Sequence, residues 1–62
     1  MNVKIYKDCG KLGKFYVLNS KKFTFVPEMA KVFKNEQAAK DFIAKNQYQG
    51  YGIDPSCLIE VI

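Results

Sequence analysis

The side chains best suited to nucleophilic chemistry are the thiols of Cys9 and Cys57, the two cysteines of the sequence. A thiol is activated by a neighbouring cation or a general base, and Cys9 has Asp8 and Lys11 close by in the sequence. Histidine, the commonest general base, is absent. The acidic residues are scattered, and no pair has the spacing of a shared catalytic site. We therefore expect that the protein is not an enzyme and that both thiols are free.

Metal and phosphate chemistry also lack their usual motifs. Two cysteines without histidine cannot complete a four-ligand zinc site in one chain, which leaves a thiolate site shared by two chains, or a redox role, as the alternatives. Asp8 stands where a phosphate-binding loop needs its first glycine, and a phenylalanine follows the Gly-Lys pair at residues 13–14. The glycine-rich motif that binds dinucleotides follows a strand and begins a helix, whereas Gly50 and Gly52 follow a predicted helix. We therefore expect neither a metal nor a cofactor.

These residues must be positioned by the elements of the fold, and the clearest element is a helix over residues 36–46. Asn35 is a good N-cap, because its side chain can accept a hydrogen bond from the free N–H groups of the first turn. Glu36 in the first turn and Lys45 in the last turn both suit the helix dipole. A narrow apolar stripe on this helix needs a sheet to cover it. The residues of the stripe are Ala38, Ala39, Phe42 and Ile43.

Alternating apolar and polar residues predict strands before the helix. Two of them cover residues 2–7 and 14–19, which we expect to form a hairpin, and a third covers residues 22–26. Residues 27–29 begin with a proline and suit one helical turn. Residues 30–33 are predicted to return to a strand that leads into the helix.

The last segment, residues 57–62, is β-branched and apolar enough for a central or two-sided strand. The predicted order is β-β-(β)-β-α-β, an α+β fold with one helix packed on a small, mostly antiparallel sheet. The 62 residues suit a single domain, residues 1–62, near the lower size limit for folding alone. A homodimer would bury more apolar surface, and the final strand would offer an open edge for pairing.

Positive charge is concentrated in the first part of the chain. Residues 1–26 hold six lysines against one acid, whereas residues 27–62 hold four lysines against five acids. Lysine suits phosphates and acidic surfaces, and arginine, the more usual reader of base edges, is absent. A solvated face explains the lysines equally well. The alternative is nucleic-acid binding at hairpin ends near Tyr6 and Tyr16. The lysines of this alternative are Lys11, Lys14, Lys21 and Lys22.

Residues 47–56 form the longest stretch without periodicity, and they contain two glycines, a proline and two tyrosines. Long loops in compact domains are often functional, and exposed tyrosines are rigid anchors at protein interfaces. We therefore place the partner-binding surface in this loop and the adjacent sheet edge. The candidate contact residues are Tyr48, Tyr51, Ile53 and Asp54.

Three segments of the chain form a recognisable set: FYVLN, FTFVPEMAKVFKNEQAAKDFI and the terminal IEV. Through them the chain resembles small proteins of unknown function that phages and prophages of Gram-positive bacteria encode. Such proteins often bind and block a host factor, including components of restriction or CRISPR defence. The resemblance therefore implies a protein partner from the host or the phage. The matching residues are Tyr16, Val17, Phe25, Glu28, Met29, Ala30, Lys31, Val32, Phe33, Ala39, Phe42, Ile43, Ile59, Glu60 and Val61.

The sequence shows neither a secretory signal nor a membrane span. Lys4 and Lys7 interrupt the apolar residues of the N-terminus, so this segment cannot be the core of a signal peptide. The longest apolar run, residues 15–18, is too short to cross a membrane. We expect a small, basic, cytoplasmic protein. The leading hypothesis is a non-enzymatic protein-binding module, an inhibitor of a host defence protein; the alternative is the nucleic-acid-binding module.

Overall fold

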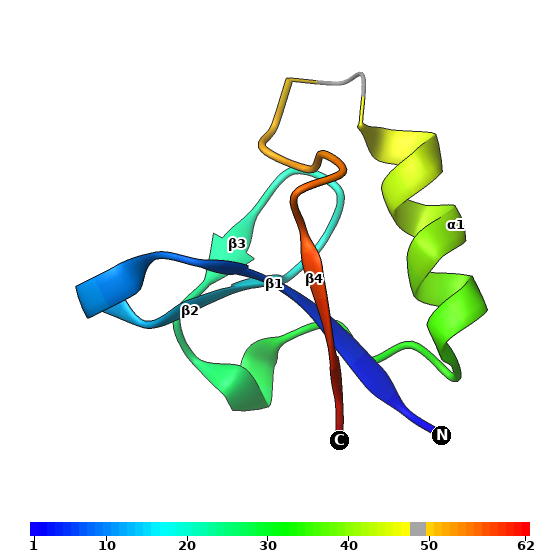
Figure 1. Cartoon of the computed structure of the whole chain (residues 1–62), viewed down its shortest axis with the longest axis horizontal. Coiled ribbons are helices and arrows are strands. Elements are labelled where there is room, and N and C mark those ends of the chain that lie inside the picture. Colours follow the sequence, from blue (N-terminus) through cyan, green and yellow to red (C-terminus); the bar gives the residue numbers. More distant parts are fainter. Residues whose placement is uncertain (48–49) are drawn as a thin grey trace.

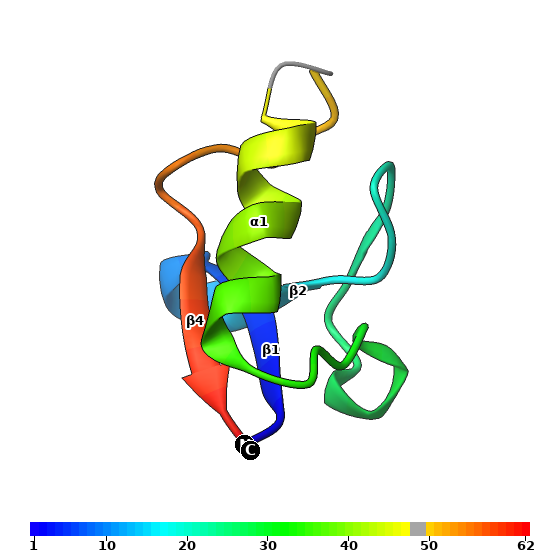
Figure 2. The same ribbon diagram turned by 90° about the vertical axis from the view of Figure 1, so that its right-hand side faces the viewer.

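The computed structural model describes residues 1–47 and 50–62 of the chain. Figures 1 and 2 show α1 packed against one face of a small sheet, with both termini at the same end of the molecule. Among residues 1–47 and 50–62, α1 is the one α-helix, so the opposite face of the sheet is not covered by a second one. In chain order, with η for a 3-10 turn, the elements are β1 (Val3–Asp8), η1 (Gly10–Leu12), β2 (Lys14–Val17), β3 (Phe23–Thr24), η2 (Pro27–Met29), α1 (Glu36–Asn46) and β4 (Leu58–Val61).

The sheet has four strands in the order β3-β2-β1-β4, and every neighbouring pair is antiparallel. This arrangement confirms the predicted α+β fold, the hairpin of the first two strands and the helical turn at Pro27–Met29. The prediction of a central or two-sided final strand is wrong, because β4 lies at the edge and pairs with β1 alone. The apolar side chains of Leu58 and Val61 are exposed at this edge instead of being buried on two sides.

The predicted strand at residues 30–33 is also wrong, because only an isolated bridge between Val3 and Phe33 forms there. The two residues exchange backbone hydrogen bonds of 2.9 and 2.8 Å, whereas Lys31 donates its N–H to the carbonyl of Val17 on β2 at 2.9 Å. The segment therefore touches two different strands in turn and builds no continuous ladder with either. Ala30 and Phe33 are buried by this arrangement, which fastens the chain just before α1.

Helix α1 begins as the sequence predicts. The side chain of Asn35 accepts a hydrogen bond from the Ala38 N–H at 2.8 Å, which satisfies one of the free donors of the first turn. Ala39 is fully buried against the sheet, and the ring of Phe42 lies 5.1 Å from the ring of Phe33. Ala38, Phe42 and Ile43 pack on the core as predicted.

The core lies between α1 and the covered face of the sheet. Val3 and Ile5 alternate along β1 toward this face, as the period-two pattern predicts, and Lys4 and Tyr6 point to the open face. Within the described residues, no helix has the length and apolar character that a membrane span requires. The buried core consists of Val3, Ile5, Val17, Phe33, Ala39, Ile53 and Cys57.

Candidate protein-interaction surfaces

Candidate sites on this molecule lie on its open surface. The surface formed by residues 1–47 and 50–62 has no pocket, and no three Cys, Asp or Glu side chains of these residues gather around a position for a metal ion. Cys9 and Cys57 are free thiols, and Cys57 is buried in the core.

The sequence-predicted contact residues of the last loop fall into three different environments. Tyr48 lies outside the described residues. Tyr51 is 48% exposed, and the ammonium of Lys21 lies 5.9 Å from the centre of its ring. Ile53 is only 2% exposed and belongs to the core. Ile53 is therefore a packing residue rather than the contact residue that the sequence suggested.

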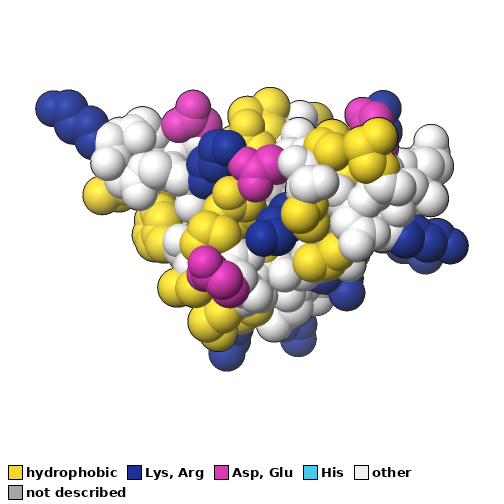
Figure 3. Space-filling view, turned by 90° about the horizontal axis from the view of Figure 1, so that it is seen from below, with side chains coloured by type: hydrophobic (Ala, Val, Ile, Leu, Met, Phe, Trp, Pro, Cys, Tyr) yellow, Lys and Arg dark blue, Asp and Glu magenta, His cyan; other side chains and the backbone are white. Residues whose placement is uncertain are grey.

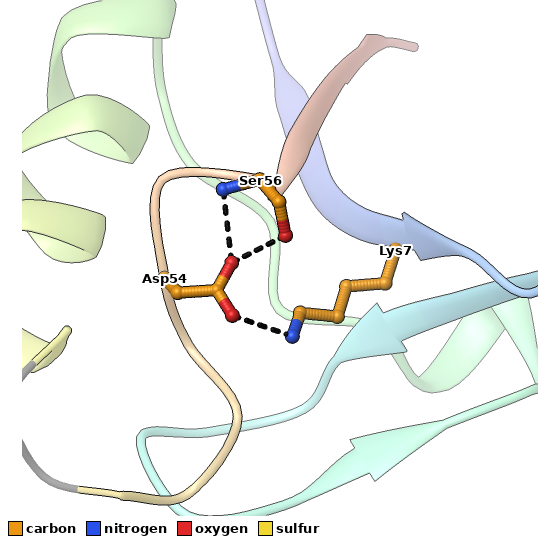
Figure 4. Close-up of polar contacts among 3 residues, drawn as sticks. All are labelled: Lys7, Asp54 and Ser56. Atoms are coloured by element: carbon orange, nitrogen blue, oxygen red, sulfur yellow. Dashed lines mark hydrogen bonds and ion pairs between the residues drawn. The ribbon is translucent and has the colours of Figure 1, made fainter.

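Asp54 fastens this loop to the sheet (Figure 4). Its carboxylate accepts hydrogen bonds from the Lys7 ammonium at 2.9 Å, from the Ser56 N–H at 2.9 Å and from the Ser56 hydroxyl. The Ser56 hydroxyl, followed by the Lys7 ammonium, lowers the pKa of Asp54 to about 2. Because Lys7 belongs to β1, this cluster joins the end of the loop to the centre of the sheet.

The lysines of the nucleic-acid alternative lie at two ends of β2. Lys11 and Lys14 lie at the β1–β2 connection, whereas Lys21 and Lys22 lie at the β2–β3 connection. Lys14 forms an ion pair with the carboxylate of Glu60, and the Lys14 ammonium lies 4.8 Å from the centre of the Tyr6 ring. The four lysines are therefore divided between two strand connections, and nucleic-acid binding stays a prediction.

The open face of the sheet holds a hydrogen-bonded cluster around Glu60. Its carboxylate accepts hydrogen bonds from the Tyr16 hydroxyl at 2.8 Å and from the Lys14 ammonium. The Lys14 ammonium, followed by the Tyr16 hydroxyl, lowers the pKa of Glu60. Burial, followed by the hydrogen bond to Glu60, raises the pKa of Tyr16, which is only 5% exposed. These groups satisfy one another, so Tyr16 has little ring surface to offer to a nucleobase.

Four large apolar side chains are half exposed along residues 25–32, and we call them the turn surface. The exposed fractions are 48% for Phe25, 45% for Val26, 57% for Met29 and 51% for Val32. Hydrophobic side chains gather on the underside of the molecule, where η2 and the chain termini lie (Figure 3). Exposed apolar side chains in such a concentration are typical of protein interaction sites.

The backbone of the turn surface is held at several points. The Thr24 side-chain oxygen accepts the Val26 N–H at 3.0 Å, and the Val26 carbonyl accepts the Met29 N–H at 3.0 Å. The carbonyl of Pro27 accepts the Lys4 ammonium at 2.7 Å, which joins the turn to β1. The ring of Phe25 stacks on the ring of Phe15, and the two ring centres lie 4.4 Å apart. The backbone of the turn surface is therefore anchored both to β1 and to its own turn.

A second group of exposed apolar side chains, which we call the edge surface, lies along β4 and the neighbouring chain ends. Leu58 is 46% exposed, Val61 58%, Ile62 62% and Met1 83%. The Ile62 N–H donates to the Asn2 carbonyl at 2.9 Å, so the last residue continues the pairing of β4 with β1. The edge surface therefore combines exposed apolar side chains with an unpaired side of the sheet.

The sequence contains a signal for the turn surface that the strand pattern conceals. The alternation of Phe23 and Phe25 predicts a strand through Val26, yet β3 ends at Thr24, whose hydroxyl captures the Val26 N–H. A threonine two residues before an apolar residue and a proline is a turn pattern as well as a strand pattern.

Comparisons with known protein families, curated proteins and solved structures found no match to this chain.

Proposed function

We propose that this chain is a non-enzymatic protein-binding module whose partner docks on the turn surface. The observation that carries the proposal is the fixed display of Phe25, Val26, Met29 and Val32, each about half exposed on an anchored turn. A rigid binding segment loses little conformational freedom when the complex forms, so more of its contact energy appears as affinity. A few well-packed residues carry most of the binding energy at protein interfaces, and methionine and phenylalanine are enriched there.

The partner of this surface would be a protein with an apolar depression rimmed by acidic residues. The turn surface supplies the apolar anchors, and the net charge of +4 on the chain would accelerate the approach of an acidic protein. Together with the resemblance to small phage proteins, these features support a role as an inhibitor of a host protein in the cytoplasm, with defence proteins as the first candidates.

The proposal is tested by capture of the partner from a Gram-positive lysate with the tagged chain, in nuclease-treated and untreated halves. We expect one protein, retained in both halves in near-stoichiometric amount. Loss of the captured proteins after nuclease treatment would contradict the proposal and favour Lys11, Lys14, Lys21 and Lys22 as nucleic-acid contacts.

Variants locate the contact surface in the same experiment. The double variant Val26→Ser/Met29→Ser removes two exposed anchors and is expected to lose the partner while its unfolding transition stays close to that of the natural chain. Tyr51→Ala removes an equally exposed side chain from the other loop and serves as the matched control. Retention of the partner by the double variant, with loss by Tyr51→Ala, would instead support the sequence-based site.

A further inference from the structure

Strand β4 forms an edge of the sheet, and its protections against pairing are limited to its short length of four residues and the charge of Glu60. Natural edges are blocked by lysine, proline, bulges or a covering element. The sequence of β4, LIEV, has neither lysine nor proline, and its one charged residue, Glu60, is bonded to Lys14 and Tyr16 of the same sheet. The edge is therefore chemically open to another strand.

The hydrogen-bond pattern identifies the backbone groups that face outward. The Ile62 N–H donates to the Asn2 carbonyl, so Ile62 and the other even-numbered residues of β4 direct their backbone groups to β1. Alternate residues of a strand direct these groups to opposite sides, so Ile59 and Val61 face away from the sheet. Over residues 1–47 and 50–62, no backbone partner meets Ile59 or Val61 on that side.

We propose that the occupant of this edge is a second copy of the chain, paired antiparallel through β4 about a two-fold axis beside Glu60. In this register Ile59 of each copy exchanges hydrogen bonds with Val61 of the other, so all outward-facing groups of both residues are paired. Leu58 then lies opposite Ile62 of the second copy on the open face. Every cross-strand pair except Glu60–Glu60 is apolar, and such pairs stabilise a sheet.

The alternative registers of the same edge are less complementary. Pairing Ile59 with Ile59 of the second copy would place Leu58 opposite Glu60, an apolar residue against a carboxylate. Pairing Val61 with Val61 would place Glu60 opposite Ile62 of the second copy, again a carboxylate against an apolar residue. A two-fold axis requires one patch to match itself, and the register centred on Glu60 meets this requirement along the whole strand. Self-complementarity therefore favours a second copy over an unrelated strand.

The Glu60–Glu60 pair would be unfavourable if both charges were free, because like charges directly opposite destabilise a sheet. Each carboxylate is instead bonded to Lys14 and Tyr16 of its own copy, and Lys4 adds a further positive charge nearby. The positive charges on the open face therefore offset the repulsion across the axis.

The helices of the two copies also have room. Helix α1 packs mainly on β1, and the strand order at the joint would be β1-β4-β4-β1. The two β1 strands would lie three strand spacings apart, about 14 Å, whereas a helix with its side chains is about 10 Å wide. Both helices therefore fit on the same face of one sheet that runs through both copies.

The proposal is independent of the turn surface and is tested on the isolated protein by sedimentation across a concentration series. We expect a dimer with a Kd of about 100 μM or tighter. Val61→Pro removes an outward N–H in each copy, and the ladder with β1 stays intact because proline is tolerated on an open edge. Its Kd is expected to rise about tenfold or more through loss of two hydrogen bonds, whereas Val61→Thr retains the dimer. A chain that stays monomeric at about 1 mM, or a Val61→Pro variant that dimerises like the natural chain, would overturn the proposal.

Cross-linking tests the register with two cysteine variants in a Cys9→Ser background. Glu60→Cys places the two thiols opposite each other at a non-hydrogen-bonded pair, where the Cβ atoms of facing residues are close enough for a disulfide. Leu58→Cys lies on the same face of the same strand but faces Ile62 of the second copy. We expect rapid formation of a disulfide-linked dimer for Glu60→Cys and little for Leu58→Cys; the reverse result would overturn the register.

Discussion

The two long connections of this molecule differ in where they expose large aliphatic and phenylalanine side chains. In the loop before β4, Ile53 enters the core and Asp54 is bonded to Lys7 and Ser56. In the segment between β3 and α1, Phe25 and Met29 are about half exposed. The loop before β4 has the aperiodic sequence that suggests function, whereas the segment before α1 has the patterns of a strand and a helical turn. The comparison shows that an irregular sequence does not by itself predict exposed apolar side chains, because Ile53 of the irregular loop is buried.

The difference arises from how each connection is anchored. The loop before β4 is held by side chains, because Ile53 packs in the core and the Asp54 carboxylate binds Lys7 of β1. The turn at η2 is held largely through its backbone, since the Pro27 carbonyl accepts a hydrogen bond from Lys4 and the Lys31 N–H donates to Val17. Backbone anchoring leaves the side chains of the turn surface available for a partner.

The largest difference between the two regions is expected for truncation of their apolar residues. Ile53→Ala opens a cavity in the core and should lower the free energy of unfolding by about 2–4 kcal/mol. Met29→Ala truncates an exposed side chain and should change the free energy of unfolding by less than about 0.5 kcal/mol. Urea unfolding of both variants measures the contrast, and equal destabilisation would refute the distinction between the two connections.

A smaller effect is expected at the glycines of the loop before β4. Gly52 has a φ of +97°, and a Cβ at this position would lie 3.2 Å from the ring of Phe23, so Gly52→Ala should cost about 1–2 kcal/mol. Gly50 has a φ of +74° with open space around it, so Gly50→Ala should cost less. Thermal unfolding compares the two variants. An equal loss of stability in the two variants would show that backbone strain alone, without the contact to Phe23, determines the destabilisation by Gly52→Ala.

The capping hydrogen bond of the turn surface should have a still smaller effect on stability. Thr24→Ala leaves the Val26 N–H without its acceptor and should cost about 0.5–1 kcal/mol. The same variant should weaken partner binding, because the turn surface becomes less fixed. Thr24→Ser keeps the hydroxyl and should behave like the natural chain in both measurements. Full affinity in Thr24→Ala would show that the cap does not contribute to binding.

The smallest expected effect is the pH dependence that Asp54 contributes. The pKa of Asp54 in the folded chain, about 2, lies below the value of about 3.9 for an unfolded chain. The cluster with Ser56 and Lys7 therefore stabilises the fold above about pH 4, and this contribution is lost as the pH falls toward 2. Thermal unfolding of the natural chain and Asp54→Asn should differ at pH 5 and converge near pH 2. A constant difference would contradict this assignment.

The first strand and the start of the helix were predictable from the sequence, whereas the alternating residues 22–26 predicted a longer strand than β3. The alternation of Val3 and Ile5 located β1, and Asn35 located the start of α1. The segment at residues 30–33 was not predictable as a bridge, because its residues suit a strand while the neighbouring backbone of Val3 and Val17 decides its hydrogen bonds. The local sequence pattern indicates which secondary structure a segment prefers. The strand with which the segment pairs depends on the rest of the fold.

The candidate surfaces were less predictable for the same reason. Nothing local to Ile53 shows that it reaches the core, because burial depends on how the loop returns to β1. The exposure of Phe25 and Val26 accompanies the early end of β3 at Thr24, where the Thr24 hydroxyl accepts a hydrogen bond from the Val26 N–H. The sequence offered both a central position and an open edge for the final strand, and only the observed pairing with β1 decides between them and identifies the outward-facing residues.

The most direct test of the turn surface is the affinity of the captured partner, measured by titration calorimetry with three chains. Compared with the natural chain, Val26→Ser/Met29→Ser should raise the Kd about 30-fold or more, as expected when interface anchors are lost. Tyr51→Ala should change the Kd by less than about threefold. An unchanged Kd for the double variant, with a large loss for Tyr51→Ala, would contradict the turn surface and return the contact site to the loop before β4.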